Sequence, residues 1–269
     1  MTKTISAAAN PAMANQLIQK MEEESLPVLE PEIALPLDTM VELPGGFITD
    51  SGEVNRSAEV RELNGKDEEA IARATSMGKA LLTILNRCVV KVGDKPATED
   101  ILDNLLAGDR DMLLLSILKV TFGANPKVAT YCGGCQDYKE VLVDLNSDIK
   151  VKVLVNPIED RVFTVKGKAG DIVVQLPTGR IQKDLINNPD RTGAELTTAL
   201  LRGTVMSINN SPIFSDAQVQ MLSVSDRRLI VSELNQRIPG PQFESLTAVC
   251  PDCEGEVSVP VTLDSLFRL

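Results

Sequence analysis

The sequence contains no histidine among its 269 residues, and aromatic residues make up only 3 % of it. Without histidine the chain lacks the side chain that ordinarily titrates near neutral pH and serves as a general base. It also lacks the glycine-rich phosphate-binding patterns and the G-x-S-x-G pattern of hydrolases. Carboxylates are plentiful, but no pair of them has a spacing that differs from solvated helix faces. The sequence therefore predicts a protein that is not an enzyme.

The sequence also lacks an apolar run that approaches the roughly 20 residues of a membrane-spanning helix. Its first residues hold no continuous apolar core, so we expect no secretory signal and folding in a cytoplasm, where structural disulfides are rare. The net charge of −11 opposes binding to phosphate backbones, and few aromatic side chains are present to stack on bases. Membranes, nucleic acids and small-molecule substrates are not the expected partners.

The residues that are present have the composition of a folded protein, since 43 % are hydrophobic. Residues 1–40 differ from the rest of the chain. Pro27, Pro31 and Pro36 favour an extended segment there over a packed element. Two interpretations remain open for these residues: a disordered leader, or an arm that becomes ordered only on a partner subunit.

From Val41 onward the pattern predicts alternating strands and helices. "VELPGGFI" reads as a strand and turn in which two glycines supply positive φ. Asn64 or Gly65 is expected to cap one helix with an apolar stripe from Ile71 to Leu85. A second helix is expected from Thr98 to Gly108, and a third, largely buried, over "DRDMLLLSILKVTF". A β-hairpin follows, with a pair of cysteines at its tip.

The second half of the sequence repeats this order. The pattern Val41-x-Leu43-Pro44-x-Gly46-x-Ile48 recurs as Val174-x-Leu176-Pro177-x-Gly179-x-Ile181. Residues 84–118 align without a gap on residues 200–234, with eight identities in 35 pairs, where about two are expected by chance. The identities include Leu85/Leu201, Leu106/Leu222 and Leu113/Leu229. The alignment favours an internal duplication, and the alternative is coincidence between two helical stretches.

These patterns predict an α+β fold made of two related helix-rich repeats with short β-hairpins. The expected organisation is an extended arm (1–40), a first repeat (41–147), a small β-rich linker (148–173) and a second repeat (174–269). Each repeat contributes one C-x-x-C hairpin, and we expect a pseudo-twofold arrangement to bring the two hairpin tips together at one shared metal site.

Four of the five cysteines form two C-x-x-C pairs, Cys132/Cys135 and Cys250/Cys253. A cysteine pair on a hairpin tip can bind one side of a tetrahedral zinc, and two pairs complete the coordination. Four thiolates leave no open position for water, so such a zinc is structural. The spacing predicts one structural zinc, although it does not separate zinc from iron.

Two other interpretations of the cysteines stay open. C-x-x-C also marks thioredoxin-like redox proteins, but there the motif opens a helix, whereas Cys135 precedes a strand-like segment. The four thiols could also be reduced core cysteines. Cys88 lies on the apolar side of a predicted helix and is expected to belong to the core.

The order of these motifs resembles that of a known family. "VELPGGFI", "AEVRELNGKDEE", the helix that ends near "ILNRCV", the Asp109–Asp111 step and the C-x-x-C hairpin with "LVDL" are similar to the baseplate hub protein family of contractile-tailed (T-even-type) bacteriophages. The resemblance covers residues 41–145 and returns more weakly in residues 174–263. It implies a non-enzymatic tail baseplate or hub-assembly protein that binds other tail proteins and is assembled in the bacterial cytoplasm.

Two other functional hypotheses remain beside a tail protein. A zinc-ribbon adaptor in transcription or replication would bind protein partners through the same cysteines, and a thiol oxidoreductase would use them in exchange reactions. Metal content with a thiol titration separates the oxidoreductase from the other two. Co-purification with tail proteins or with a polymerase separates those two from each other.

Overall fold

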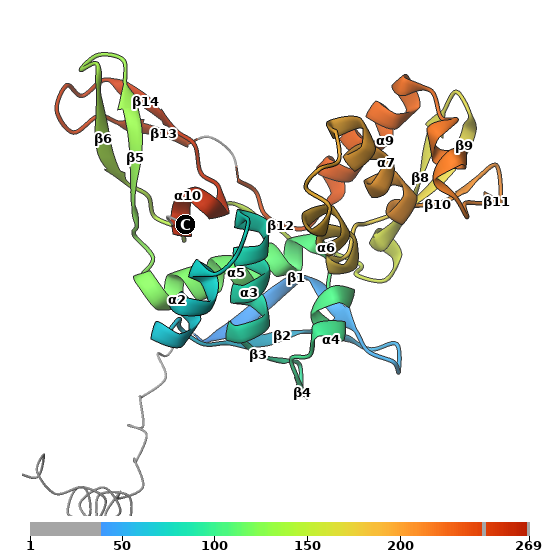
Figure 1. Cartoon of the computed structure of the whole chain (residues 1–269), viewed down its shortest axis with the longest axis horizontal. Helices are drawn as coiled ribbons and strands as arrows, with labels where there is room; N and C mark the ends of the chain where they lie inside the picture. Colours follow the sequence, from blue (N-terminus) through green and yellow to red (C-terminus); the bar gives the residue numbers. More distant parts are fainter. Residues whose placement is uncertain (1–38, 244–245, 268–269) are drawn as a thin grey trace, which may run out of the picture. The chain divides into compact units, whose positions relative to one another are not determined.

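The structure is a computed structural model that describes residues 39–243 and 246–267. The expected arm, residues 1–40, lies outside the described residues apart from Thr39 and Met40. The described part combines helices with antiparallel strand pairs (Figure 1). None of its helices has both the length and the apolar character needed to cross a membrane.

The first half is a four-stranded sheet in the order β1-β2-β3-β4, with four helices. The strands are β1 (Met40–Ile48), β2 (Val54–Val60), β3 (Val89–Val92) and β4 (Lys95–Pro96), and the helices are α2 (Gly65–Ala72), α3 (Met77–Cys88), α4 (Glu99–Asn104) and α5 (Ala107–Phe122). Helix α5 packs against β1 and β2 and carries four fully buried side chains, Leu113, Leu115, Ile117 and Leu118. Strand β1 is continuous where a strand and turn were expected, and only Gly46 of the two glycines has a positive φ, at a register shift opposite β2.

The helix expected from Asn64 to Leu85 is in fact two helices. Asn64 caps α2 as predicted, and its side chain and that of Asp67 exchange hydrogen bonds with each other's backbone. The chain then leaves the helix, and the Ser76 hydroxyl accepts from the Lys79 N–H to begin α3. A serine that can cap a new helix competes with helix continuation, which explains the break.

Gly108 was expected to end a helix, but it lies in the first turn of α5. Helix α4 ends earlier, at Asn104, and Leu105 and Leu106 are extended. Gly108 is needed because the backbone of residues 239–240 crosses it: a Cβ built on Gly108 would lie 1.6 Å from the Pro239 carbonyl oxygen. The glycine permits a close approach of two backbones and is not a helix stop.

Gly108→Ala is therefore expected to destabilise the protein by about 1–3 kcal/mol through overpacking. The clash is with backbone, which cannot rotate away. Urea unfolding measures the loss, and Gly65→Ala is the matched control, since a Cβ on Gly65 meets nothing within 4 Å. Equal stability of the two variants would contradict this account of Gly108.

The second half has a sheet of the same connectivity, β8-β9-β10-β11. Its strands are β8 (Val162–Gly167), β9 (Gly170–Gln175), β10 (Val205–Ile208) and β11 (Ser211–Pro212), and its helices are α6 (Gly179–Asn187), α7 (Gly193–Thr204), α8 (Asp216–Gln220) and α9 (Val224–Arg237). A separate core forms here around Ile172, Val174, Leu201 and Ile230. In both halves two helices separate the second strand from the third, and two more follow the fourth.

The segment expected to be a linker, 148–173, holds strand β7 (Val151–Lys152), the short 3-10 helix η2 (Glu159–Arg161), strand β8 and most of β9. The expected boundary at 173/174 therefore falls inside β9. The match between the patterns that begin at Val41 and Val174 does not join equivalent strands. Val41 lies in β1, the first strand of its sheet, whereas Val174 lies in β9, the second strand of the other sheet.

The second half has one extra residue that the gapless alignment does not include. An offset of 116 residues superimposes α3 on α7 and β3 on β10, but the connection after β11 is one residue longer than that after β4. At the uncorrected offset Leu113, fully buried, would match Leu229, which is 38 % exposed. At an offset of 117 it matches Ile230, which is fully buried. Leu85 and Leu201 do both occupy core positions.

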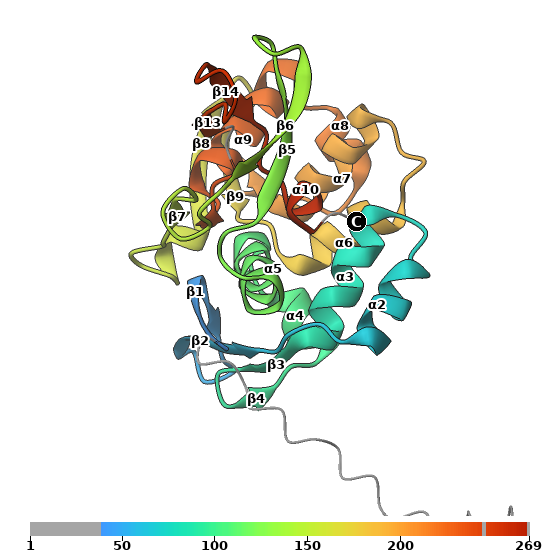
Figure 2. The same ribbon diagram turned by 90° about the vertical axis from the view of Figure 1, so that its left-hand side faces the viewer.

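The two halves contact each other through helix α6 and the turn before α5. The Ala107 N–H donates to Pro177 O at 2.9 Å, and the Gly179 N–H donates to Leu105 O at 2.8 Å. Leu106 lies in the core of the second half. Helix α6 contacts α3, α4 and α5 of the first half (Figure 2).

The end of the chain returns to the first half. Strand β12 (Gly240–Pro241) pairs with β7 and contacts helix α5. Strands β13 (Leu246–Val249) and β14 (Glu256–Val259) and helix α10 (Leu263–Phe267) follow. Val257, Val259, Leu266 and Phe267 are buried in the core of the first half, not in that of the second. The second hairpin is therefore separated from the half whose sequence precedes it.

Candidate metal centre

Both cysteine pairs lie on the tips of antiparallel hairpins. Strand β5 (Lys127–Cys132) pairs in continuous register with β6 (Asp137–Leu142), and β13 pairs with β14. The residue after the second cysteine has a positive φ in each tip, +54° at Gln136 and +58° at Glu254. The two tips therefore share a left-handed turn residue directly after the second cysteine.

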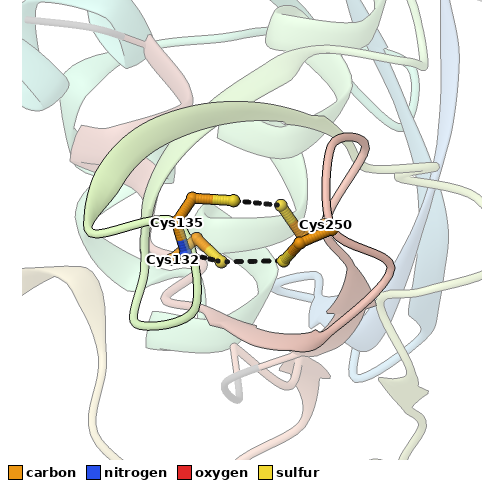
Figure 3. Close-up of side chains that lie close together, drawn as sticks. Cys132, Cys135 and Cys250 are labelled. Atoms are coloured by element: carbon orange, nitrogen blue, oxygen red, sulfur yellow. Dashed lines mark hydrogen bonds between the residues drawn. The ribbon is translucent and has the colours of Figure 1, made fainter.

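The four sulfur atoms converge (Figure 3). Cys132 Sγ lies 3.6 Å from Cys253 Sγ, and Cys135 Sγ lies 3.8 Å from Cys250 Sγ. All four sulfurs lie within 4.8 Å of one another. The structure thus brings together all four cysteines that the sequence predicted, although they come from segments more than a hundred residues apart.

These distances fit a metal better than disulfides. Tetrahedral Zn–S bonds of about 2.3 Å place neighbouring sulfurs about 3.8 Å apart, whereas a disulfide needs about 2.05 Å. Each close pair joins one sulfur of the first hairpin to one of the second, so both hairpins would contribute two ligands. Cys132 and Cys250 are buried, and Cys253 is exposed. The donor set and geometry fit a four-thiolate site.

The backbone around the sulfurs favours thiolate at one position. N–H groups of Cys253 and Asp252 point at Cys250 and lower the pKa of its thiol to about 7. The pKa of Cys135 rises to about 12, chiefly because its sulfur shares hydrogen bonds with Cys253. Four thiolates this close repel one another, and a bound cation would offset that repulsion.

Thr130 and Lys139, which sequence reasoning missed, link the two hairpins. The Thr130 hydroxyl donates to Ser258 O at 2.7 Å, and Lys139 pairs with Asp252 at 2.7 Å. A Cβ on Gly134 would lie 3.2 Å from Cys253 Sγ, so this position is kept small. The glycines of "CGGC" were a usable signal, but the partners of Thr130 and Lys139 are too distant in sequence to be read from it.

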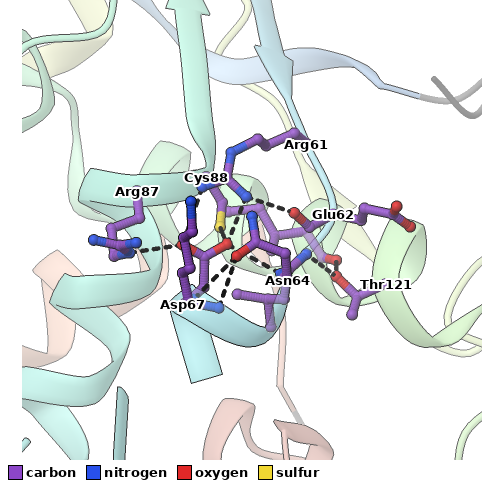
Figure 4. A network of polar contacts seen from close by, with 10 residues as sticks. Arg61, Glu62, Asn64, Asp67, Arg87, Cys88 and Thr121 are labelled. Atoms are coloured by element: carbon purple, nitrogen blue, oxygen red, sulfur yellow. Dashed lines mark hydrogen bonds and ion pairs between the residues drawn. The ribbon is translucent and has the colours of Figure 1, made fainter. Parts of the chain in front are cut away.

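A second buried polar cluster surrounds Asp67 (Figure 4). Its carboxylate accepts from Arg61 Nη1 at 2.6 Å, from Arg87 Nε at 2.6 Å and from the Asn64 N–H at 3.0 Å. Burial opposes ionisation, but these donors outweigh it and hold the pKa of Asp67 far below its usual range. The fully buried Cys88 lies beside it, and burial raises the pKa of that thiol to about 11. Both carboxylate oxygens of Asp67 accept hydrogen bonds.

Comparison with known families identifies the chain. A family model described as T4 bacteriophage base plate protein matches residues 48–208, which is more than half of the sequence. The match runs from the end of β1 to the end of β10 and includes the first cysteine pair. No curated protein and no solved structure matches the chain. Together with the order of its motifs, the match shows that this chain belongs to the T4 bacteriophage base plate protein family.

Proposed function

We propose that the chain is a structural or assembly subunit of the baseplate hub of a contractile phage tail, and that it binds neighbouring tail proteins through its N-terminal arm and its surface. The observation that carries the proposal is the family match over residues 48–208. Membership of a baseplate family supports a structural role in the phage tail. The hub position and the use of the arm go further, and they are supported by the motif order and by the prolines of residues 1–40.

We further propose that Cys132, Cys135, Cys250 and Cys253 bind one structural zinc. The support is the convergence of four sulfurs within 4.8 Å from two hairpin tips. Zinc would supply a rigid cross-link between the two hairpins and, with four thiolates bound, would offer no open position for catalysis. The thioredoxin-like alternative loses its structural basis here, because both motifs lie at hairpin tips and neither opens a helix.

The two halves are proposed to descend from one duplicated unit. Beyond the common element order, equivalent side chains make equivalent bonds at the offset of 117. Arg110 Nη1 donates to Leu102 O and Arg227 Nη1 donates to Val219 O, both at 3.4 Å. In this proposal the second unit begins at β8, and the C-terminal hairpin has been transferred onto the first unit's core.

The proposed role of the arm predicts a protease result. In the isolated chain, protease is expected to remove residues 1 to about 40 and leave a stable remainder, because the prolines there favour an extended segment that packs poorly by itself. In purified baseplates the same bonds are expected to be protected. Mass spectrometry of timed digests identifies the cut sites.

Two results would contradict this proposal. An arm already protected in the isolated chain would mean that it packs on its own domain. Absence of the chain from purified baseplates and hub precursors, together with co-purification with a polymerase, would favour the zinc-ribbon adaptor instead. A chain with residues 1–38 deleted is the control, and it should fold but fail to enter the hub.

A further inference from the structure

The first half has a groove between its helices that helix α6 of the second half fills. Ile186 packs on Gly78, where an added Cβ would lie 2.9 Å from the isoleucine side chain. Gly179, the first residue of α6, lies against Arg110 and the Leu102 carbonyl, 2.6 Å from where its Cβ would stand. The Gln182 side chain interacts with the Asp111 carboxylate. A glycine, a polar residue and a large apolar residue of α6 thus make the internal contact.

The second half has an equivalent groove that is open. It lies between α7 and α9, has a volume of about 620 Å³ and is lined by Ala194, Thr197, Val224, Arg227, Arg228 and Val231. Ala194 matches Gly78 at the offset of 116, and Arg227 and Arg228 match Arg110 and Asp111 at 117. Val224 is 64 % exposed there. Within the described residues no helix lies in this groove as α6 lies in the first one.

Helix α2 is the element of the first half that corresponds to α6. It follows β2 as α6 follows β9, and it too begins with glycine. Counted from that glycine, Glu68 corresponds to Gln182 and Ala72 to Ile186. Gly65 has open space where its Cβ would be, and Glu68 and Ala72 are exposed. The face of α2 that would make the α6-type contact is therefore available.

Two of the differences between the two sets of positions are complementary. In the open groove Arg228 takes the place of Asp111, and on α2 Glu68 takes the place of Gln182, so an ion pair would replace the polar contact. Ala194 likewise takes the place of Gly78, and Ala72 that of Ile186. These two alanines are small enough to allow close approach. At a third position the match is unfavourable: Lys183, which pairs with Asp103 and Glu99, becomes Glu69, whereas Glu99 becomes Asp216 at the offset of 117.

We propose that the groove between α7 and α9 binds helix α2 of a second copy of this chain, so that copies associate head to tail. The inference rests on the proposed duplication, because the duplication matches the open groove to the filled one. Such an interface is heterologous: each copy presents a groove at one end and α2 at the other. Association would repeat between copies the contact that joins the two halves within one copy.

Sedimentation velocity of the full-length chain over a wide concentration range tests the proposal. The wild-type chain is expected to associate, and Arg228→Glu or Glu68→Arg is expected to weaken association at least about tenfold by opposing like charges. The double variant, which exchanges the two charges, should recover it. An equimolar mixture of the two single variants should also associate beyond dimers, because each groove can then meet a helix α2 of opposite charge on the other variant, whereas neither variant should associate well alone.

The control is Lys95→Glu, an exposed charge on β4 away from both surfaces, which should associate like the wild type. Circular dichroism checks that each variant is folded. A chain that stays monomeric at every concentration, or association that neither charge change affects, would overturn the proposal. The duplication itself is judged separately, by superposing residues 54–122 on residues 170–238 of an experimental structure, and does not depend on association.

Discussion

Replacing Cys250 with serine is expected to remove bound zinc and to lower the free energy of unfolding by about 3–6 kcal/mol. A structural zinc contributes about 10 kcal/mol or more to isolated zinc-finger peptides, and this chain retains a core of its own when the metal is lost. Elemental analysis should find one zinc per wild-type chain and none in the variant. Urea unfolding gives the stability change.

The loss of stability in the Cys250→Ser variant is expected to be confined largely to the first half. Both hairpins belong to the core of the first half, while the second half has a separate core. Hydrogen exchange should therefore accelerate first in β5, β6, β13 and β14 and in the helix α5 beneath them, and least in α7 and α9. Equal acceleration in both halves would instead support the expectation that the metal fastens the two repeats to each other.

Cys88→Ala is the matched control, because Cys88 is buried but lies outside the cluster. It should keep one zinc per chain and lose only the packing of one small side chain. A wild-type protein that is fully folded without metal, or that binds two metals, would contradict the single shared site. An unchanged thermal midpoint in the Cys250 variant would show that the cysteines have no structural role.

Asp67→Asn is expected to cost about 3 kcal/mol at neutral pH. The carboxylate is fully buried between Arg61 and Arg87, and removing one partner of a buried ion pair typically costs about 3–5 kcal/mol. The two arginine side chains are 29 % and 40 % exposed, and so can partly rehydrate. This places the expected loss at the lower end of that range.

The contribution of Asp67 to the free energy of unfolding is expected to fall in acid. Asp67 has a pKa well below its unfolded value of about 4, so its stabilisation is present above about pH 4 and is lost as the pH falls toward the folded value. The wild type should lose this contribution in acid, whereas the asparagine variant has none to lose. The two stability curves should therefore converge below pH 4.

Glu69→Ala tests a surface ion pair on the same helix. Glu69 and Arg73 are 74 % and 81 % exposed, and such pairs contribute less than about 1 kcal/mol. If Glu69→Ala cost as much as Asp67→Asn, burial would not be the source of the effect. Parallel stability curves for wild type and Asp67→Asn below pH 4 would likewise contradict the assignment.

Local signals in the sequence were sufficient for part of this structure. Asn64 and Thr98 cap helices as predicted, because capping depends on side chains within three residues. The hairpin tips that carry Cys132 and Cys250 were also predictable, since strand pattern and turn residues are adjacent there. A mixed helix and sheet fold followed from such short-range information, and the meeting of the two distant cysteine pairs followed from the four ligands that one structural zinc takes.

The remaining features depend on contacts that sequence spacing does not reveal. Gly108 looked like a helix stop because the backbone that crosses it lies more than 130 residues away. Asp67 looked like an ordinary helix-start acid, although its partner Arg87 lies on the next helix. The one-residue insertion before α8 was hidden because leucines recur often enough in helices to align at either offset.

The return of the chain's last strands to the first half has a consequence for synthesis. The core around Leu113 and Leu115 includes Val257, Val259 and Phe267, which are synthesised after most other residues of that core. Contacts of such long sequence separation form late and slowly. While translation proceeds, the apolar side of α5 and of the β5–β6 hairpin stays exposed, and chains truncated near residue 240 should aggregate, not accumulate as a folded first half.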